Sequence, residues 1–391
     1  MISVNEALEK LFTLAKVTPV EKVELRKCLG RVLAEPLRAT SNNPPFPSSA
    51  MDGYAINKKD LKFGKEFKVI GESAAGHSYN KAIDQNEAVR IFTGSRIPDG
   101  ANFVIIQEDV EAFGASIKVK EKFDKKSHIR MEGSDFSIGH TVMAPLILGA
   151  KDISLIAAMN FSHISVRKKP IVAIISTGDE LVFPGEIPKS DQIIASNAFG
   201  IAALCEDCGA VTRILPIAQD NLKSIEYIMG LAQGADVIIT IGGASVGKYD
   251  LVNAATNNLG IDKSFYKVAM RPGKPLMAGK INNTPIIGLP GNPVSALVCG
   301  YVFIKPLIHA MLGLERKSTP RLKALCSNPI PENGPREHYM RAVLLPNGCL
   351  KPTDNQDSAR LALLSYANAL LIRPPHAKAI PADTLCEYIK I

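Results

Sequence analysis

The chain contains no tryptophan, and only 6% of its 391 residues are aromatic. A charged fraction of 21% and a hydrophobic fraction of 46% are ordinary for a soluble globular protein, so a disordered chain is excluded. We find no internal repeat and no low-complexity segment. A chain of this length exceeds what one hydrophobic core supports, so we expect two to four domains.

Uninterrupted apolar runs of transmembrane length are also missing. The longest candidate, near residues 146–159, is divided by Lys151 and Asp152. The N-terminus lacks the basic and then apolar pattern of a signal peptide, and Ser3 with Glu6 predicts a helix capping box instead. We therefore expect a soluble, cytoplasmic protein without a membrane partner.

The seven cysteines are odd in number and irregularly spaced, which argues against a disulfide framework and for a reducing compartment. Cys205 and Cys208 form a C-x-x-C without a second pair or a nearby histidine. This favours buried or incidental thiols, with redox or zinc use as the alternative. The seven histidines likewise show no metal-ligand spacing.

Blocks of like charge are absent, although the formal net charge is +8. The densest basic runs, at residues 58–59, 125–126 and 167–169, have no interleaved aromatic residues. We interpret them as solvated surface and expect no nucleic-acid partner. A small polyanionic ligand fits the charge better.

The N-terminal part alternates between helical and β-like patterns. Helices are predicted at residues 6–16 and 20–29, before a proline-rich break at 42–49, and again at 152–160. β-like runs between them occur at residues 68–70, 88–92, 102–107 and 116–120. We assign residues 1–45 and 138–168 to a discontinuous helical and linker domain, and residues 46–137 to a β-rich insert.

From Pro170 onward the pattern becomes strand, loop, helix. Strands are predicted at 171–176, 211–217, 236–241 and 285–288, and helices at 196–208, 221–233 and 293–311. This rhythm is typical of a three-layer α/β unit with a mostly parallel sheet, placed at residues 169–317, whose ligands lie beyond the carboxyl ends of the strands. β-like runs at 321–326, 338–345, 370–373 and 385–391 predict a small closed, barrel-like β domain at residues 318–391.

Three glycine-containing loops fall within the α/β unit. Their sequences are D-V-I-I-T-I-G-G-A-S-V-G-K-Y-D at 236–250, R-P-G-K-P at 271–275 and G-L-P-G-N-P-V-S at 288–295. Glycine lets backbone N–H groups approach an anion, and the third loop precedes a helix whose start stabilises negative charge. Each loop alone could be an ordinary strand-to-helix turn. The three together, with Arg271 and Lys274, favour an oxyanion-binding site.

Six motifs in this order resemble the MoeA family, the molybdopterin molybdenumtransferases, over nearly the whole chain. They are S-A-M-D-G-Y-A at 49–55, R-I-F-T-G at 90–94, S-T-G-D-E-L at 176–181, T-I-G-G-A-S-V-G at 240–247, R-P-G-K-P at 271–275 and G-L-P-G-N-P-V-S-A at 288–296. The resemblance implies an elongated homodimer in which the α/β unit holds the cofactor precursor. It also implies that N-terminal residues of the partner subunit complete the active cleft.

The implied reaction depends on Mg²⁺, releases AMP from adenylylated molybdopterin and inserts molybdate at the dithiolene sulfurs, which gives molybdenum cofactor and AMP as products. The α/β unit alone is also similar to molybdopterin adenylyltransferases, which leaves adenylyl transfer from ATP as an alternative and such an enzyme as a suggested partner. The motifs A-M-D-G-Y-A and F-T-G count against that alternative, since a standalone adenylyltransferase would lack them. A non-catalytic molybdopterin-binding scaffold is a third interpretation, weakened by the absence of an extra module.

The resemblance also assigns residues. Catalytic roles fall on Asp52, Thr93, Asp135, Glu180, Asp220, Asp250, Arg271 and Lys274, with Asp52, Glu180, Asp220 and Asp250 as candidate Mg²⁺ ligands. Binding of the molybdopterin substrate falls on Thr177, Gly178, Asp179, Ser196, Asn197, Gly242, Gly243, Ser245, Gly247, Gly273, Pro290, Gly291, Asn292, Pro293 and Ser295. Mg²⁺ is coordinated by one or two carboxylates together with phosphate oxygens. A Mg²⁺ ion between them would therefore allow acidic residues to lie beside anionic substrates. The family often has lysine at the position of Arg271.

Structural roles compete with several of these assignments. Asp52 and Thr93 each precede a glycine, Asp135 follows Gly133 and Ser134, and all three could stabilise turns. Glu180, Asp250 and Ser196 could cap the helices that follow them. The paired prolines Pro290 and Pro293 could be rigid scaffolding of the loop.

Overall fold

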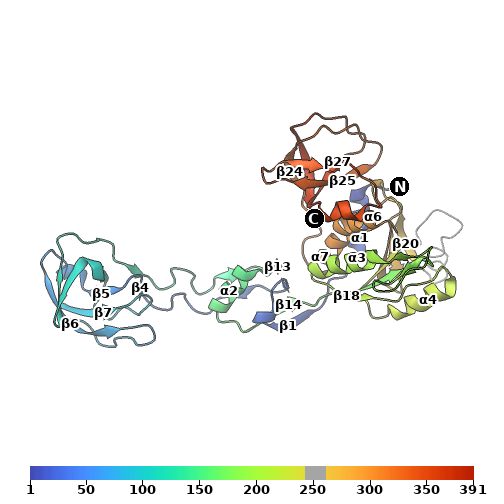
Figure 1. The fold of residues 1–391 in the computed structure, drawn as a ribbon. Coiled ribbons are helices and arrows are strands. Elements are labelled where there is room, and N and C mark those ends of the chain that lie inside the picture. The colour runs from blue at the N-terminus through green and yellow to red at the C-terminus, as the bar shows by residue number, and fades with distance from the viewer. Residues whose placement is uncertain (243–260) are drawn as a thin grey trace.

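A computed structural model describes residues 1–242 and 261–391. Figure 1 shows an elongated molecule with a β-rich insert at one end, a stalk in the middle, and the α/β unit with the C-terminal β domain at the other end. The predicted residues Gly243, Ser245, Gly247 and Asp250 lie outside the described residues.

The stalk is built from segments on both sides of the insert. Its four-stranded sheet has the order β1-β14-β2-β13, and strand pairs β3–β12 and β4–β11 continue toward the insert. Its strands are β1 Val20–Glu24, β2 Val32–Leu33, β3 Leu37–Arg38, β4 Ser48–Ser49, β11 Ile129–Arg130, β12 Thr141–Val142, β13 Leu146–Ile147 and β14 His163–Arg167, and its helices are η1 Leu25–Lys27 and α2 Ala150–Ala158.

The helix predicted at residues 20–29 is wrong. Val20–Glu24 is strand β1, paired antiparallel with β14 from Val20↔Arg167 to Glu24↔His163. Only a short 3₁₀ turn, Leu25–Lys27, follows it. Pairing with a strand some 140 residues away overrides the local helical spacing, since backbone and side-chain contacts across the sheet outweigh a weak propensity.

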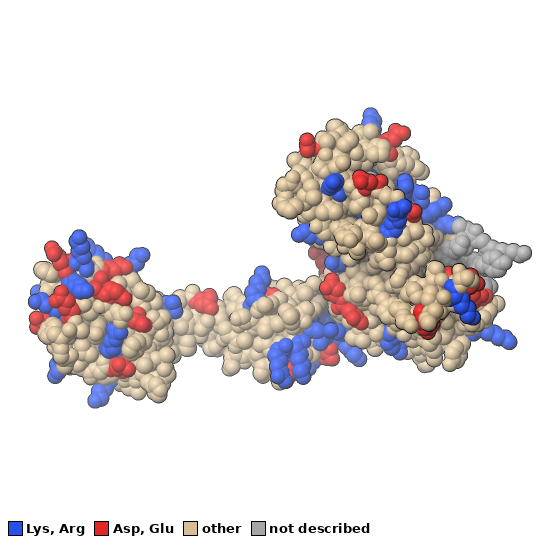
Figure 2. Space-filling model, in the orientation of Figure 1, with Lys and Arg blue, Asp and Glu red and all other residues tan. Residues whose placement is uncertain are grey.

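The insert is one six-stranded sheet of order β8-β5-β7-β6-β10-β9. Its core contains Phe67, Phe103 and Ile117. Its elements are β5 Gly53–Ile56, η2 Lys58–Asp60, β6 Glu66–Ser73, β7 Glu87–Ile91, β8 Phe103–Ile106, η3 Gln107–Asp109, β9 Val110–Phe113 and β10 Ser116–Val119. Basic and acidic side chains are interspersed over the face of the insert in Figure 2, and no single-sign field covers that face.

The α/β unit has a six-stranded sheet of order β18-β15-β19-β23-β22-β20, in which the first four strands are parallel. The chain passes from β15 outward to β18 and then back to β19, so the switch point of the sheet lies between β15 and β19. Its elements are β15 Ile171–Ser176, β16 Leu181–Val182, β17 Ile193–Ile194, α3 Ser196–Asp207, β18 Val211–Ile214, α4 Leu222–Leu231, β19 Val237–Ile241, β20 Asp262–Tyr266, β22 Met277–Ile281, β23 Thr284–Leu289, α6 Pro293–Cys299, η4 Gly300–Ile304 and α7 Lys305–Met311.

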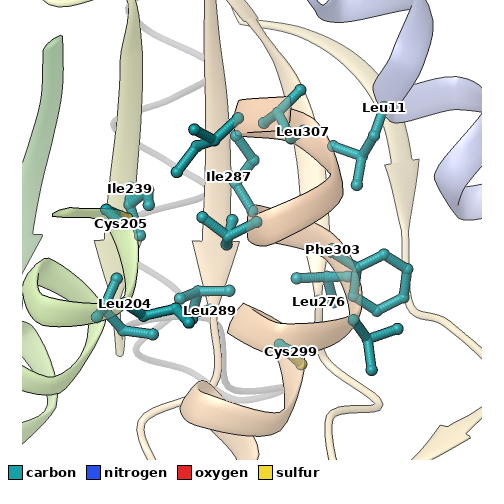
Figure 3. Close-up of a cluster of buried hydrophobic side chains, with 14 of the residues drawn as sticks. Leu11, Leu204, Cys205, Ile239, Leu276, Ile287, Leu289, Cys299, Phe303 and Leu307 are labelled. Carbon is teal, nitrogen blue, oxygen red and sulfur yellow. The ribbon is translucent and has the colours of Figure 1, made fainter. Parts of the chain in front are cut away.

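The main core joins the sheet to α3 and to the continuous helix formed by α6, η4 and α7. Figure 3 shows Leu204, Ile287 and Phe303 from these elements packed together with Leu11 of helix α1, Val4–Leu14. The amphipathic helix α1 therefore packs against the α/β unit although it is first in sequence. The division of the chain into four domains stays a prediction.

Within residues 1–242 and 261–391, one helix has the length and hydropathy of a membrane span, Pro293–Met311, and 78% of its most apolar window is buried inside the protein. Val298, Phe303 and Leu307 of this helix lie in the main core. Its apolar character is that of a core helix.

The C-terminal strands close into a barrel. The order β25-β26-β24-β28-β27 returns to β25, because β25 also pairs with β27, and short strand β21 adds to β25 in parallel. Its elements are β21 Met270–Arg271, β24 Leu322–Cys326, β25 Glu337–Leu344, β26 Leu350–Pro352, α8 Leu361–Ser365, β27 Ala369–Arg373 and β28 Thr384–Lys390. The closed β unit predicted from the sequence is confirmed.

The C-x-x-C pair is buried on α3. Burial, as the largest cause, raises the pKa of Cys205 to about 12 and that of Cys208 to about 11. The part of the chain that the structure describes contains no group of three His, Cys, Asp or Glu side chains that could hold a metal ion. The prediction of buried thiols is confirmed for this pair.

These pKa values lead to a measurable reactivity pattern. In the native protein at pH 8, we expect one thiol, Cys349, to react quickly with a disulfide reagent, because the other six cysteines are buried. Cys349→Ser should remove the fast phase, whereas Cys205→Ser should leave it unchanged. A fast phase that persists without Cys349 would contradict this assignment.

Candidate active cleft of the α/β unit

A cleft of about 820 Å³ lies at the carboxyl ends of the parallel strands. Its floor consists of the residues that follow β15, β19 and β23. These three strands are neighbours in the sheet, and the switch point lies between the first two. Predicted site residues that line it are Thr177, Gly178, Glu180, Ser196, Asn197, Asp220, Gly242, Lys274, Pro290, Gly291, Asn292 and Pro293. The structure thus brings together parts of all three predicted loops.

The cleft floor depends on a close approach between two turns. Gly242 has a φ of +91°, and a Cβ at this position would lie 2.8 Å from the backbone oxygen of Thr177. The buried hydroxyl of Thr177 has no hydrogen-bond partner among the residues that the structure describes. A hydroxyl that lines a cleft and lacks a partner is available to a bound ligand.

Gly242→Ala is therefore expected to lower the free energy of unfolding by roughly 1–3 kcal/mol, because alanine is strained at this φ and collides with the Thr177 turn. Denaturant unfolding measures this change. Gly230→Ala is the matched control, because Gly230 lies in helix α4 with no atom near the added Cβ. The control should gain about 0.5–1 kcal/mol from helix propensity.

The acidic side of the cleft contains three carboxylates on two loops. The Oδ1 atom of Asp179 accepts a hydrogen bond from the backbone N–H of Asp220 at 2.9 Å. Burial first, and then the charges of Asp179 and Glu180, raise the pKa of Asp220. Glu180 and Asp220 line the cleft. Asp179 does not line it, and its side chain instead fixes the Asp220 loop through this hydrogen bond. Crowded carboxylates of this kind favour a proton or a cation between them.

Hydrogen bonds from neighbouring elements fix the third loop. The Asn197 side-chain amide, on the first turn of α3, donates to the Gly291 carbonyl at 2.6 Å. The Asn292 amide donates to the Ser358 hydroxyl at 3.0 Å, and the Val294 N–H donates to the Ser358 carbonyl. The C-terminal β unit therefore supports the cleft, and its residue Ala359 contributes to the lining.

Several predicted residues lie elsewhere. Gly273 is packed against Cys299 and Met270, and Ser295 is buried on the first turn of helix α6. Arg271 lines a different cavity, at the mouth of the C-terminal barrel. Ser196 occupies the first turn of α3, whose N-cap is Ala195, so the helix-cap interpretation of Ser196 is wrong.

Asp52 and Thr93 adjoin strands β5 and β7 of the insert, which lies at the other end of the elongated molecule from the α/β unit (Figure 1), and Asp135 lies between the stalk strands β11 and β12. Asp52 Oδ1 accepts hydrogen bonds from the Thr93 N–H at 2.7 Å and the Thr93 hydroxyl at 2.9 Å. These bonds, and to a smaller extent the charge of Arg90, lower the pKa of Asp52. Asp135 Oδ2 accepts from the Asn43 amide at 2.9 Å. The insert thus presents an ionised carboxylate in a defined turn.

Several lining residues were not on the predicted list, and four of them, Lys267, Ile193, Ile194 and Ala359, contribute to the charge and shape of the cleft. Lys267 places a second cation beside Lys274, while Ile193 and Ile194 of strand β17 form an apolar wall. Lys267 has a φ of +67° and lies between β20 and β21, so its position depends on sheet geometry. Ala359 reaches the cleft only through the fold of the C-terminal unit. No local pattern in the sequence marks any of the four.

The fold and the cleft define an α/β protein of the class that binds anionic ligands at the carboxyl edge of a parallel sheet. Comparison with known proteins narrows this class. Three family models match the chain: "MoeA N-terminal region (domain I and II)" over residues 2–160, "Probable molybdopterin binding domain" over 173–310, and "MoeA C-terminal region (domain IV)" over 323–391.

Curated relatives agree with these models. A molybdopterin molybdenumtransferase of Haemophilus influenzae is 35% identical over 84% of this chain and 82% of its own length. One of Nostoc sp. is 32% identical over 90% of this chain and 85% of its own length. A crystal structure of a molybdopterin biosynthesis MoeA protein from Pyrococcus horikoshii matches with a TM-score of 0.85 and 26% identity, covering all of both chains. The chain belongs to the MoeA family, whose curated members are transferases of molybdenum cofactor biosynthesis.

Proposed function

We propose that this enzyme inserts molybdate into adenylylated molybdopterin, releasing AMP and molybdenum cofactor, in a Mg²⁺-dependent reaction in the cytoplasm. The observation that carries the proposal is the cleft itself. It combines backbone turns after three parallel strands, the cations Lys267 and Lys274, and the carboxylates Glu180 and Asp220. Family membership supports the same reaction class.

The donor set fits a magnesium ion. Mg²⁺ is held by one or two carboxylates with substrate phosphates and water, so Glu180 and Asp220 suffice without a three-residue cluster. The raised pKa of Asp220 reflects burial and the like charges of Asp179 and Glu180, which a divalent ion would offset. When bound, the ion would neutralise phosphate charge beside these carboxylates.

The chain's own residues position the substrate. Lys274 and Lys267 attract the phosphates, and the turns at Gly178, Gly242 and Gly291 offer backbone dipoles to anionic oxygens. Ile193 and Ile194 supply apolar surface for the ring system of the organic substrate. Attack of a water or molybdate oxygen on the phosphoanhydride, with AMP as the leaving group, would depend mainly on positioning and charge neutralisation.

We propose that the active form is a homodimer. Asp52 and Thr93 lie at the opposite end of the molecule from the cleft, so they reach a cleft only if it belongs to a second copy (Figure 1). The ionised Asp52 would then approach Glu180 and Asp220 of the partner. Each complete site would contain residues from both chains.

The test supplies purified protein with adenylylated molybdopterin, Mg²⁺ and low molybdate. AMP release and reconstitution of an apo-molybdoenzyme are measured together. We expect both to depend on molybdate and to occur without ATP. AMP formation only during ATP consumption would favour an adenylyltransferase, and binding without turnover would favour a scaffold.

A further inference from the structure

A second cavity, of about 390 Å³, opens at the mouth of the C-terminal barrel. Arg271, His338 and Arg373 lie in its lining. In the sheet, Arg271 is the parallel partner of His338, and His338 is the antiparallel partner of Arg373, so the three residues lie side by side on β21, β25 and β27. We call this the barrel-mouth cavity.

Positive charge gathers around His338 in the cavity wall. Burial, and then the charges of Arg271, Arg336, Arg341 and Arg373, lower the pKa of His338 to about 4. Within the described residues, none of these four arginines forms a salt bridge. The acidic lining residues Glu332 and Asp354 are exposed and unpaired with them. Buried cations usually pair with an anion, and Arg373, the buried arginine of the lining, has no such partner among the described residues.

Arg341 and Arg373 differ in what their guanidinium groups can do. Arg341 donates to the carbonyls of Asp357, Arg360 and Asn355 and supports a loop. Arg373 is only 6% exposed and donates to the Lys378 carbonyl, while its Nε has no partner in the described chain. Arg373 therefore retains an unused donor in the cavity wall, and His338 next to it is also more than nine-tenths buried.

The walls of the cavity are held in place before any ligand arrives. The Asn333 amide donates to the carbonyls of Arg336, Arg373 and Pro374 at 2.8–3.1 Å. The Gln356 amide donates to the Arg341 carbonyl and accepts from the Arg341 N–H. Pinned loops of this kind lower the ordering cost of binding.

The size and the remaining lining indicate the ligand. Cavities of about 300–1,000 Å³ hold small organic molecules. Ile330, Met340 and Pro352 add apolar surface beside the cationic group. We propose that the barrel-mouth cavity binds a small organic phosphate monoester, with the phosphate on Arg271, His338 and Arg373.

This site would communicate with the active cleft over a short segment. Arg271 lines the barrel-mouth cavity, and Lys274, three residues later, lines the cleft. The Lys274 carbonyl accepts from the Val268 N–H, which anchors the segment between the two. A phosphate on Arg271 would thus act on the backbone that positions Lys274.

The test titrates the full-length protein with ribose 5-phosphate by calorimetry, with ribose and inorganic phosphate as parallel probes. We expect ribose 5-phosphate to bind and both parallel probes to bind at least tenfold more weakly. Arg373→Met should weaken binding by about tenfold or more, since it removes a charge-assisted hydrogen bond. Lys274→Met in the cleft and Lys323→Met on the outer barrel should leave binding unchanged.

Other results would overturn the proposal. Loss of binding in Lys274→Met but not in Arg373→Met would place the ligand in the cleft. Equal binding of inorganic phosphate or of ribose would exclude recognition of a monoester, as would no binding at millimolar ribose 5-phosphate. If Arg373→Met does not fold, Arg271→Met takes its place, because Arg271 is exposed. Arg271→Met should likewise weaken the binding of ribose 5-phosphate by about tenfold or more.

Discussion

Glu180→Ala is expected to lower molybdate-dependent turnover by about 10²–10³-fold, measured as AMP release from adenylylated molybdopterin. The carboxylate lies in the cleft and folds back over Gly178, where a Cβ would meet its oxygens. The substitution removes one of the two carboxylates that line the cleft opposite the cations Lys267 and Lys274. The fold should not suffer, because Glu180 is exposed.

The stability of this variant gives an independent check. Glu180 raises the pKa of Asp220 through like-charge repulsion, so its removal should lower that pKa and leave the melting temperature unchanged or higher. Asp191→Ala is the matched control, since Asp191 is an exposed acid in the next loop, between β16 and β17, and does not line the cleft. Near-parental turnover of Glu180→Ala would remove Glu180 from the site.

The sequence was most informative where short-range patterns and tertiary structure agree. The buried runs Ile171–Ser176 and Val237–Ile241 form parallel strands, because continuous β-branched residues suit a sheet covered on both faces. The loops that follow these strands must then meet at one edge. The grouping of Gly178, Gly242 and Gly291 could therefore be predicted from strand order alone.

The sequence was least informative where contacts join distant segments. Strand β1 was predicted as helix because its pairing with β14 has no local sign. Arg271 was expected beside Lys274, but strand β21 pairs with β25 and turns this side chain toward the barrel. Lys267 and Ala359 enter the cleft through sheet geometry and the C-terminal unit, which no spacing rule describes.

A mixture of two inactive variants should recover activity. Asp52→Asn is expected to abolish turnover, although its amide oxygen can still accept from Thr93 and preserve the turn. If the insert of one chain completes the cleft of the other, a heterodimer of Asp52→Asn and Glu180→Ala has one site with both acids and one with neither. Random assortment of a twofold dimer then restores about a quarter of the parental activity.

The experiment mixes the variants under conditions that exchange subunits and measures AMP release against each variant alone. The matched control pairs Asp52→Asn with Thr93→Ala, whose defects fall in the same hydrogen-bonded turn. Every chain in that pair carries a defect in this turn, so no assortment produces an intact one, and the mixture should do no better than Thr93→Ala by itself. Recovery confined to the Asp52 and Glu180 pair requires that the two acids act from different chains. Its absence, with exchange verified, would mean that the insert acts on its own chain or outside the reaction.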